Sequence, residues 1–162
     1  MYNKTMNVKK TMSLNSMYFN RFLLIRYTIS LFFFSNLYWL VLLKVTYTSL
    51  IPLFLIILLI LPIYENFKCF GEKNSNMRSS QTYIKIQLIC NLFLMVICIS
   101  PIFIKFFPML NEEIFSRTIM CGFLILGSIL LILCLKKLQK IESNSDKYYG
   151  YIEKIEKSID VK

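Results

Sequence analysis

Four long stretches of the chain contain almost no charged residues, and short polar segments separate them. They cover residues 22–43, 47–64, 84–107 and 116–136. Within each stretch the apolar residues are continuous rather than alternating with polar ones, which favours helices over strands. At about 1.5 Å per residue, a helix of about 20 residues spans the hydrocarbon core of a bilayer. The pattern therefore predicts an all-α integral membrane protein, a bundle of four transmembrane helices.

Turn-forming residues and prolines mark the ends of these predicted helices. Residues 46–49, with the sequence Thr-Tyr-Thr-Ser, are polar enough for a tight turn between the first two spans. Pro52 then falls in the first turn of the second helix, where its missing N–H is tolerated. In the third stretch, Ser100 and Pro101 predict a kink near the C-terminal end, and Pro108 predicts the stop.

Basic residues are distributed very unequally between the two sides of the predicted bundle. Only Lys44, Lys105 and Arg117, of the 19 Lys and Arg residues, lie on the side of the first and third loops. Cytoplasmic segments of membrane proteins are rich in Lys and Arg, so we expect both termini in the cytoplasm. Tyr64 and Tyr83 would then mark the cytoplasmic interface. The predicted location is the cell membrane, with the chain as a multi-pass protein.

This orientation divides the chain into three parts. Residues 1–21 form a basic cytoplasmic segment, either disordered or lying on anionic lipid. Residues 22–138 form the transmembrane domain, and residues 139–162 form a cytoplasmic tail.

Composition supports a membrane protein and argues against several other classes. The chain is 56% apolar, above the roughly 45 to 50% of soluble domains, which excludes a soluble enzyme. It has no alanine but many Ile, Lys and Asn residues, as expected from an AT-rich bacterial genome. The net charge of +10 comes from basic residues at the ends of the spans, so topology and anionic headgroups account for it. We therefore expect the lipid bilayer, and no nucleic acid, as a partner.

Residues that usually perform catalysis are scarce in the spans. All nine acidic residues lie in loops or in the tail, and the chain has no histidine. The five cysteines form no C-x-x-C pair, so neither a zinc site nor a redox pair is indicated. We expect no enzymatic activity, no metal and no cofactor.

Four polar residues at membrane depth are the candidate site, because polar groups are costly there. Arg26 lies one turn from the cytoplasmic end of its span, where its side chain can extend to lipid phosphate. Asn36 lies in the same span, and Gln87 and Asn91 are four residues apart on one face of the third. Hydrogen bonding between helices and a polar passage for a substrate are both compatible with this pattern.

The tail contains a short amphipathic pattern beyond the polar linker at residues 142–146. Its apolar stripe consists of Tyr148, Ile152, Ile155 and Ile159, spaced four, three and four residues apart. A helix this short is marginal alone in water. The stripe has no obvious core of its own, so we expect it to bind lipid or another membrane or cytoplasmic protein.

The first quarter of the chain is similar to a known group of proteins. Residues 13–27, SLNSMYFNRFLLIRY, and residues 32–39, FFFSNLYW, resemble small four-span proteins of low-GC Gram-positive bacteria. Those proteins are often labelled cellobiose phosphotransferase-system transporter subunits. The resemblance implies a four-span fold and the role of a transporter subunit. A phosphoryl-accepting subunit needs a histidine or an exposed catalytic cysteine, and this chain has no histidine.

Two functional hypotheses lead, and a third, a membrane enzyme, requires catalytic groups that the sequence does not indicate. The first is a non-catalytic membrane protein that acts by contact, as an accessory or immunity-type protein. The alternative is a small transporter or transporter subunit, similar to those of sugar phosphotransferase systems. Only the alternative requires a polar path, for which Arg26, Asn36, Gln87 and Asn91 are the candidates.

Overall fold

A computed structural model describes the backbone of residues 2–43, 46–68, 77–111 and 113–160. It also describes the side chains of these residues from Met12 onward, except at position 154 and at 156–160. Every regular element in this part of the chain is a helix. Four helical stretches here are long and apolar enough to cross a membrane, as predicted: Met12–Leu43, Tyr47–Lys68, Arg78–Ile99 and Ile114–Glu153.

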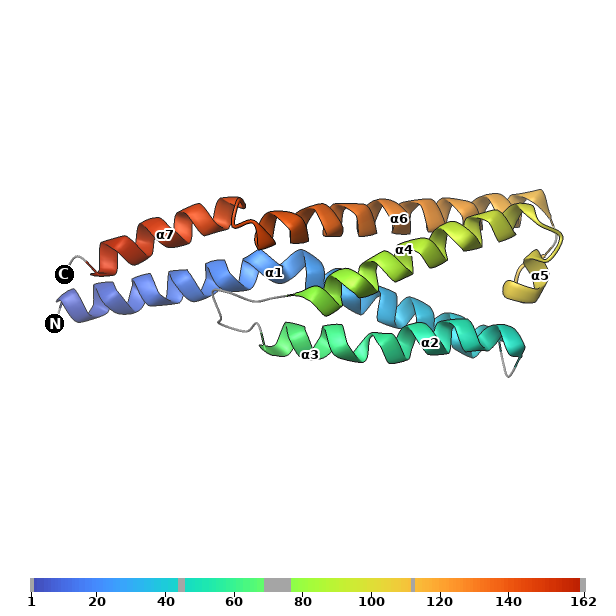
Figure 1. Cartoon of the computed structure of the whole chain (residues 1–162), viewed down its shortest axis with the longest axis horizontal. Helices are drawn as coiled ribbons and strands as arrows, with labels where there is room; N and C mark the ends of the chain where they lie inside the picture. The colour runs from blue at the N-terminus through green and yellow to red at the C-terminus, as the bar shows by residue number, and fades with distance from the viewer. Residues whose placement is uncertain (1, 44–45, 69–76, 112, 161–162) are drawn as a thin grey trace.

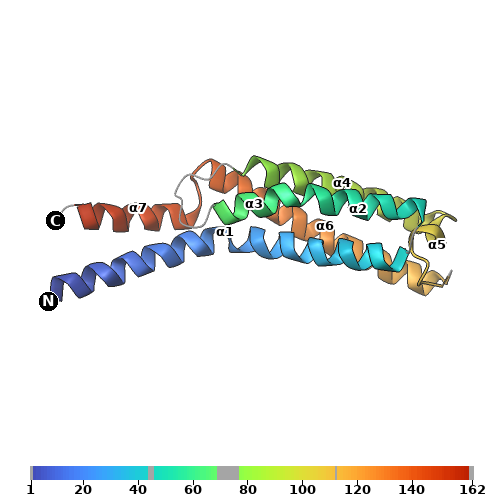
Figure 2. The same ribbon diagram turned by 90° about the horizontal axis from the view of Figure 1, so that it is seen from below.

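The helices form an elongated bundle, with both chain termini at one end (Figures 1 and 2). We call this the terminal end, and the opposite end, where α5 lies, the α5 end. The predicted turn between the first two spans forms the short 3₁₀ helix η1, and α2 and α3 follow one another almost without interruption. In chain order the elements are α1 (Tyr2–Leu43), η1 (Tyr47–Ser49), α2 (Leu50–Leu58), α3 (Ile60–Lys68), α4 (Arg78–Ile99), α5 (Phe103–Phe106), α6 (Ile114–Glu142) and α7 (Lys147–Asp160).

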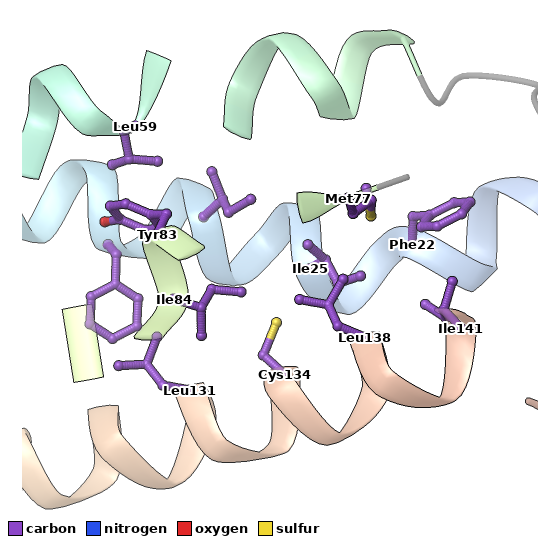
Figure 3. Close-up of a cluster of buried hydrophobic side chains, with 12 residues drawn as sticks. Phe22, Ile25, Leu59, Met77, Tyr83, Ile84, Leu131, Cys134, Leu138 and Ile141 are labelled. Carbon is purple, nitrogen blue, oxygen red and sulfur yellow. The ribbon is translucent and has the colours of Figure 1, made fainter. Parts of the chain in front are cut away.

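Two clusters of buried apolar side chains hold the helices together. The terminal core, drawn in Figure 3, joins α1, α4 and α6 with Leu59, the residue between α2 and α3, and the α5 core joins α4, α5 and α6. The terminal core contains Phe22, Ile25, Ile29, Phe32, Leu59, Met77, Tyr83, Ile84, Leu131, Cys134, Leu138 and Ile141. The α5 core contains Leu94, Ile97, Cys98, Phe103, Phe107 and Leu124.

Helix α4 ends at Ile99 and the short helix α5 follows at Phe103–Phe106, so residues 84–107 do not form the single kinked helix that the sequence predicts. Ser100 has extended backbone angles, φ −77° and ψ 155°, because a residue that precedes proline avoids the helical region. The Arg117 guanidinium on α6 donates a hydrogen bond of 3.1 Å to the Ser100 carbonyl. Pro101 thus breaks the helix instead of only kinking it, and α6 supplies a partner for a carbonyl that the break exposes.

The segment before the first predicted span is not separate from it, since α1 is one helix of 42 residues. At about 1.5 Å per residue its length is about 63 Å, roughly twice the hydrocarbon thickness of a bilayer. Its N-terminal half extends past the other spans and lies beside α7 (Figures 1 and 2).

This extension corrects the expectation that the tail stripe lacks an apolar surface within its own chain. Ile152 is fully buried, and Tyr148 and Ile155 are half-buried. Ile159 lies outside the residues whose side chains the structure describes. The sequence of residues 1–20 has no strong apolar period, so local patterns did not reveal that α1 continues there and packs against α7.

The Glu65 side chain joins α3 to the beginning of α4. One carboxylate oxygen accepts a hydrogen bond of 2.9 Å from the Ser79 N–H, and the other accepts one of 2.9 Å from the Ser80 N–H. The Ser80 hydroxyl donates a third bond, of 3.0 Å. A carboxylate at this position satisfies N–H groups that have no partner inside the helix, and it interacts favourably with the helix dipole.

We predict that Glu65→Ala lowers the free energy of unfolding by about 1 to 2 kcal/mol, because two helical N–H groups lose their acceptor. The measurement is denaturant unfolding of the purified protein in detergent. Glu113→Ala is the matched control, since Glu113 precedes α6 but makes no capping hydrogen bond through its side chain. Equal unfolding free energies for the two variants would contradict the role assigned to Glu65.

Candidate functional site in the bundle interior

Four polar side chains form a hydrogen-bonded network between α1 and α4. The Asn36 amide on α1 donates to Gln87 Oε1 on α4 at 3.0 Å, and the Tyr83 hydroxyl donates to the same oxygen at 3.0 Å. Gln87 Nε2 then donates to Asn91 Oδ1 at 3.3 Å. All four side chains are buried, each at most 4% exposed. We call these residues the amide network.

The helical repeat explains how α4 supplies three of the four groups. Tyr83, Gln87 and Asn91 are each four residues apart, so they lie above one another on a single face of α4. Asn36 faces this row from α1, with its amide also 3.4 Å from the Tyr83 hydroxyl. Gln87 is at the centre, because it accepts two hydrogen bonds and donates one. A buried amide with these partners avoids the cost of an unpaired polar group.

The structure brings together three of the four residues that the sequence indicated, namely Asn36, Gln87 and Asn91. Arg26 is not part of the network, and its guanidinium lies 4.9 Å from the centre of the Phe19 ring. Tyr83 was missed as a member, because an aromatic residue near the end of a predicted span suggests an interface position. Its spacing of four residues from Gln87 was the signal that indicated otherwise.

Apolar side chains lie on both sides of the amide network along the bundle. Toward the α5 end, the face of α4 continues from Asn91 to Leu94 and Cys98, which belong to the α5 core. Toward the terminal end, Phe22, Ile25 and Ile29 precede Asn36 on α1 by about two turns or more and belong to the terminal core. The network is therefore a polar layer between two apolar layers.

Helix α6 approaches the network closely at Gly127. A Cβ atom built on this glycine would lie 3.1 Å from Asn91 Nδ2 and 3.5 Å from Phe32 Cζ. A residue without a side chain at this position lets α6 pack directly against Asn91. The next residue, Ser128, is also buried, and its hydroxyl has no hydrogen-bond partner among the residues described.

A second buried polar cluster lies at the terminal end, where α1 meets the turn between α6 and α7. Arg21 Nε donates to both oxygens of Asp146, at 3.0 and 3.2 Å, and Nη2 lies 2.8 Å from Oδ1. Nη2 also donates to the Ile141 carbonyl and to Asn144 Oδ1, both at 3.0 Å. Both charged side chains are 1% exposed.

Sequence reasoning missed this pair for an identifiable reason. Its members are 125 residues apart, and Asp146 belongs to a polar linker that resembles a solvated turn. No local pattern connects two such residues. The pairing depends on the extension of α1 beyond the other spans.

The chemistry of both clusters is hydrogen bonding and charge pairing. In the part of the chain that the structure describes, no three His, Cys, Asp or Glu side chains gather closely enough to hold a metal ion. The amide network contains carboxamides and one phenol, so its groups donate and accept hydrogen bonds.

No protein-family model matches the chain, and the comparisons with curated proteins and with solved structures find no match. A fold alone does not specify a function, which depends on the chemistry of particular sites. In this chain the candidate sites are the amide network and the Arg21–Asp146 pair.

We predict that Gly127→Ala makes the protein less stable than Gly122→Ala by about 1 kcal/mol. Both changes favour the helix to the same extent, but only the methyl group at position 127 meets the amide network. Among the described residues, no atom beyond the local helix backbone and the two chain neighbours lies within 4 Å of the corresponding position at Gly122. Unfolding of the two purified variants in detergent measures the difference. Two variants of equal stability would show that α6 does not constrain Asn91.

Proposed function

We propose that the chain is a small, non-catalytic, multi-pass protein of a bacterial cell membrane that acts by contact with another protein. An accessory or immunity-type protein has these properties. The observation that carries the proposal is that four hydrogen bonds join the members of the amide network to one another, with apolar cores on both sides.

A network whose members bond to one another favours contact over transport because a transported polar solute needs a continuous series of hydrogen-bonding groups. The groups at Asn36, Tyr83 and Gln87 are engaged with each other, within one layer of the bundle. Phe103 and Phe107 fill the α5 end of the interior, and Phe22 lies at the terminal end. The interior thus resembles the core of a packed bundle more than a pathway.

The exposed side chains support insertion of the bundle into lipid. Large apolar residues are exposed along all four candidate spans, as expected for surfaces that lipid tails cover. Examples are Phe34 and Val41 on α1, Phe54 on α2, Val96 on α4 and Phe123 on α6. Because most basic residues lie at the terminal end, we assign that end to the cytoplasm, beside anionic headgroups.

In this orientation the N-terminal half of α1 and α7 form a two-helix projection into the cytoplasm, which we call the stalk. Its described surface includes the exposed side chains of Met12, Phe19 and Tyr151, which are 64%, 41% and 55% exposed. Since the interior offers no reactive group that we can assign, the stalk is the part best placed to contact another protein. We propose that α7 makes this contact.

A small transporter, or a subunit of one, is the alternative, and one observation favours it. The amides at Asn36, Gln87 and Asn91 lie on facing helices at the middle of the bundle. Ser128, which follows Gly127 on α6, is buried, and its hydroxyl has no hydrogen-bond partner among the described residues. Polar groups inside a membrane often line a substrate path. In this alternative the amide network opens to bind a polar solute.

We predict that reporters fused at residue 1 and at residue 162 both report the cytoplasm. The reason is the excess of Lys and Arg at the terminal end of the bundle. At each of the two positions, a reporter that is active only in the cytoplasm should give a signal. A reporter that is active only outside the cytoplasm should give none. A terminus outside the cell would contradict the proposed orientation.

A second prediction separates contact from transport by complementation of a deletion strain. Ile152→Asp combined with Ile155→Asp should abolish function, because a buried isoleucine contributes about 1.5 to 3 kcal/mol and a charge cannot replace it. Gln87→Leu combined with Asn91→Leu should leave function largely intact. Both proteins are compared at equal membrane abundance.

The opposite pattern would favour the transporter. In that case the variant with leucines at positions 87 and 91 fails to complement, whereas the tail variant complements normally. The tail variant could also lose function because it fails to insert into the membrane. In that case its level in the membrane fraction falls, and this level is measured directly.

A further inference from the structure

The apolar stripe of α7 is already partly occupied within its own chain. Ile152 is 0% exposed, and α7 packs along α1. The neighbouring stripe residues Tyr148 and Ile155 are half-buried. A partner that binds this stripe therefore has to replace α1.

We propose that α1 masks the protein-binding stripe of α7 and that the Arg21–Asp146 ion pair is the latch that keeps the mask closed. The proposal rests on the proposed function, in which α7 makes the contact with another protein. When the ion pair separates, α7 moves away from α1 and its apolar stripe becomes accessible to a partner protein.

The position of the ion pair makes it a latch for the whole of α7. Asp146 directly precedes the first residue of α7, so fixing its carboxylate fixes the start of the helix. The turn before it contains Asn144 in the left-handed region, at φ 52°, and the Asn144 side chain also accepts from Arg21. The Arg21 guanidinium lies 5.3 Å from the centre of the Tyr149 ring, one turn into α7. One side chain of α1 thus holds the turn and the first turn of the helix.

The energetics of a buried ion pair allow two states of similar free energy. Removing two charges from water costs nearly as much as their mutual attraction gains, so the docked and released states are close in free energy while the pair is intact. Loss of one partner leaves the other charge buried and uncompensated in the docked state, which favours release. The rest of the docked contact is small, because α7 has only 14 residues and a single polar turn connects it to α6. A competing partner can therefore displace α7 without unfolding the bundle.

The charge of α7 favours a helix of another protein over a lipid surface as the occupant of the free stripe. Three basic residues, Lys147, Lys154 and Lys157, are balanced by three acidic ones, Glu153, Glu156 and Asp160. A formally neutral helix gains no electrostatic attraction to anionic lipid, which interfacial helices usually use. The surface that the stripe contacts in this structure is also a helix. A second apolar helix face is the occupant that best reproduces this contact.

Hydrogen–deuterium exchange of the full-length protein in lipid nanodiscs tests the latch without any partner. Arg21→Met should accelerate amide exchange in α7 at least 10-fold, while exchange in α4 and α6 stays unchanged. The double variant Arg21→Asp with Asp146→Arg should recover much of the protection, because it restores opposite charges at the same place. Arg26→Met is the matched control on the same helix and should leave α7 protected.

Two results would overturn the latch. One is equal exchange of α7 in the wild type and in Arg21→Met, whether fast or slow in both. The other is equally fast exchange in the charge-swapped and Arg21→Met variants, which would assign the effect to lost packing of the arginine stem.

Photo-crosslinking in cells then tests the occupant. A compact diazirine amino acid at position 155 should crosslink to α1 of the same chain in the wild type and to a separate protein in Arg21→Met. Adducts with lipid, or the absence of any adduct with another protein, would contradict contact through α7. This result bears on the proposed function, whereas the exchange experiment decides the latch independently.

Discussion

A carboxamide buried between apolar helices must find a hydrogen-bond partner there, and Asn36 finds its partner on another helix, in Gln87. This bond fixes α1 relative to α4, because a shift of either helix by one residue separates the two groups. The close approach of α6 at Gly127 and the apolar cores on both sides follow from the same arrangement. The amide network therefore determines the alignment of three of the long helices.

Side chains from other helices engage helix α4 at both of its ends. The Glu65 carboxylate accepts from its first N–H groups, and Arg117 donates to the carbonyls that its C-terminal end exposes. At the same end, Trp39 on α1 donates a hydrogen bond of 2.9 Å to the Phe106 carbonyl and stacks on Phe107. These contacts close the interior at the α5 end.

The four long helices were predictable from the sequence, because each is a long uncharged stretch bounded by polar turns. The face shared by Gln87 and Asn91 was predictable too, since a spacing of four residues is a local property of a helix. Two features were not predictable from local patterns. The first is the end of α4 before Ser100 and Pro101, because a proline within an apolar stretch is compatible with a kinked helix as well as with a broken one.

The second feature that local patterns did not predict is the docking of α7 on α1. It depends on a contact between Arg21 and Asp146, 125 residues apart, and on a helical extension whose sequence has little periodicity. The stripe at Tyr148, Ile152 and Ile155 correctly indicated an amphipathic helix. Periodicity identifies which residues seek a partner, but the identity of the partner depends on the arrangement of the whole chain.

The central claim is that the amide network is a structural connection between helices. A double-mutant cycle with Asn36→Leu and Gln87→Leu measures it most directly, using the unfolding free energies of the wild type, both single variants and the double variant in detergent. If Asn36 and Gln87 stabilise the bundle through each other, the coupling is favourable and about 0.6 kcal/mol, up to about 1.7 kcal/mol, as for hydrogen bonds between helices inside membrane proteins. Strictly additive effects of the two substitutions would contradict the central claim, because they would mean that Asn36 and Gln87 do not stabilise the bundle through each other.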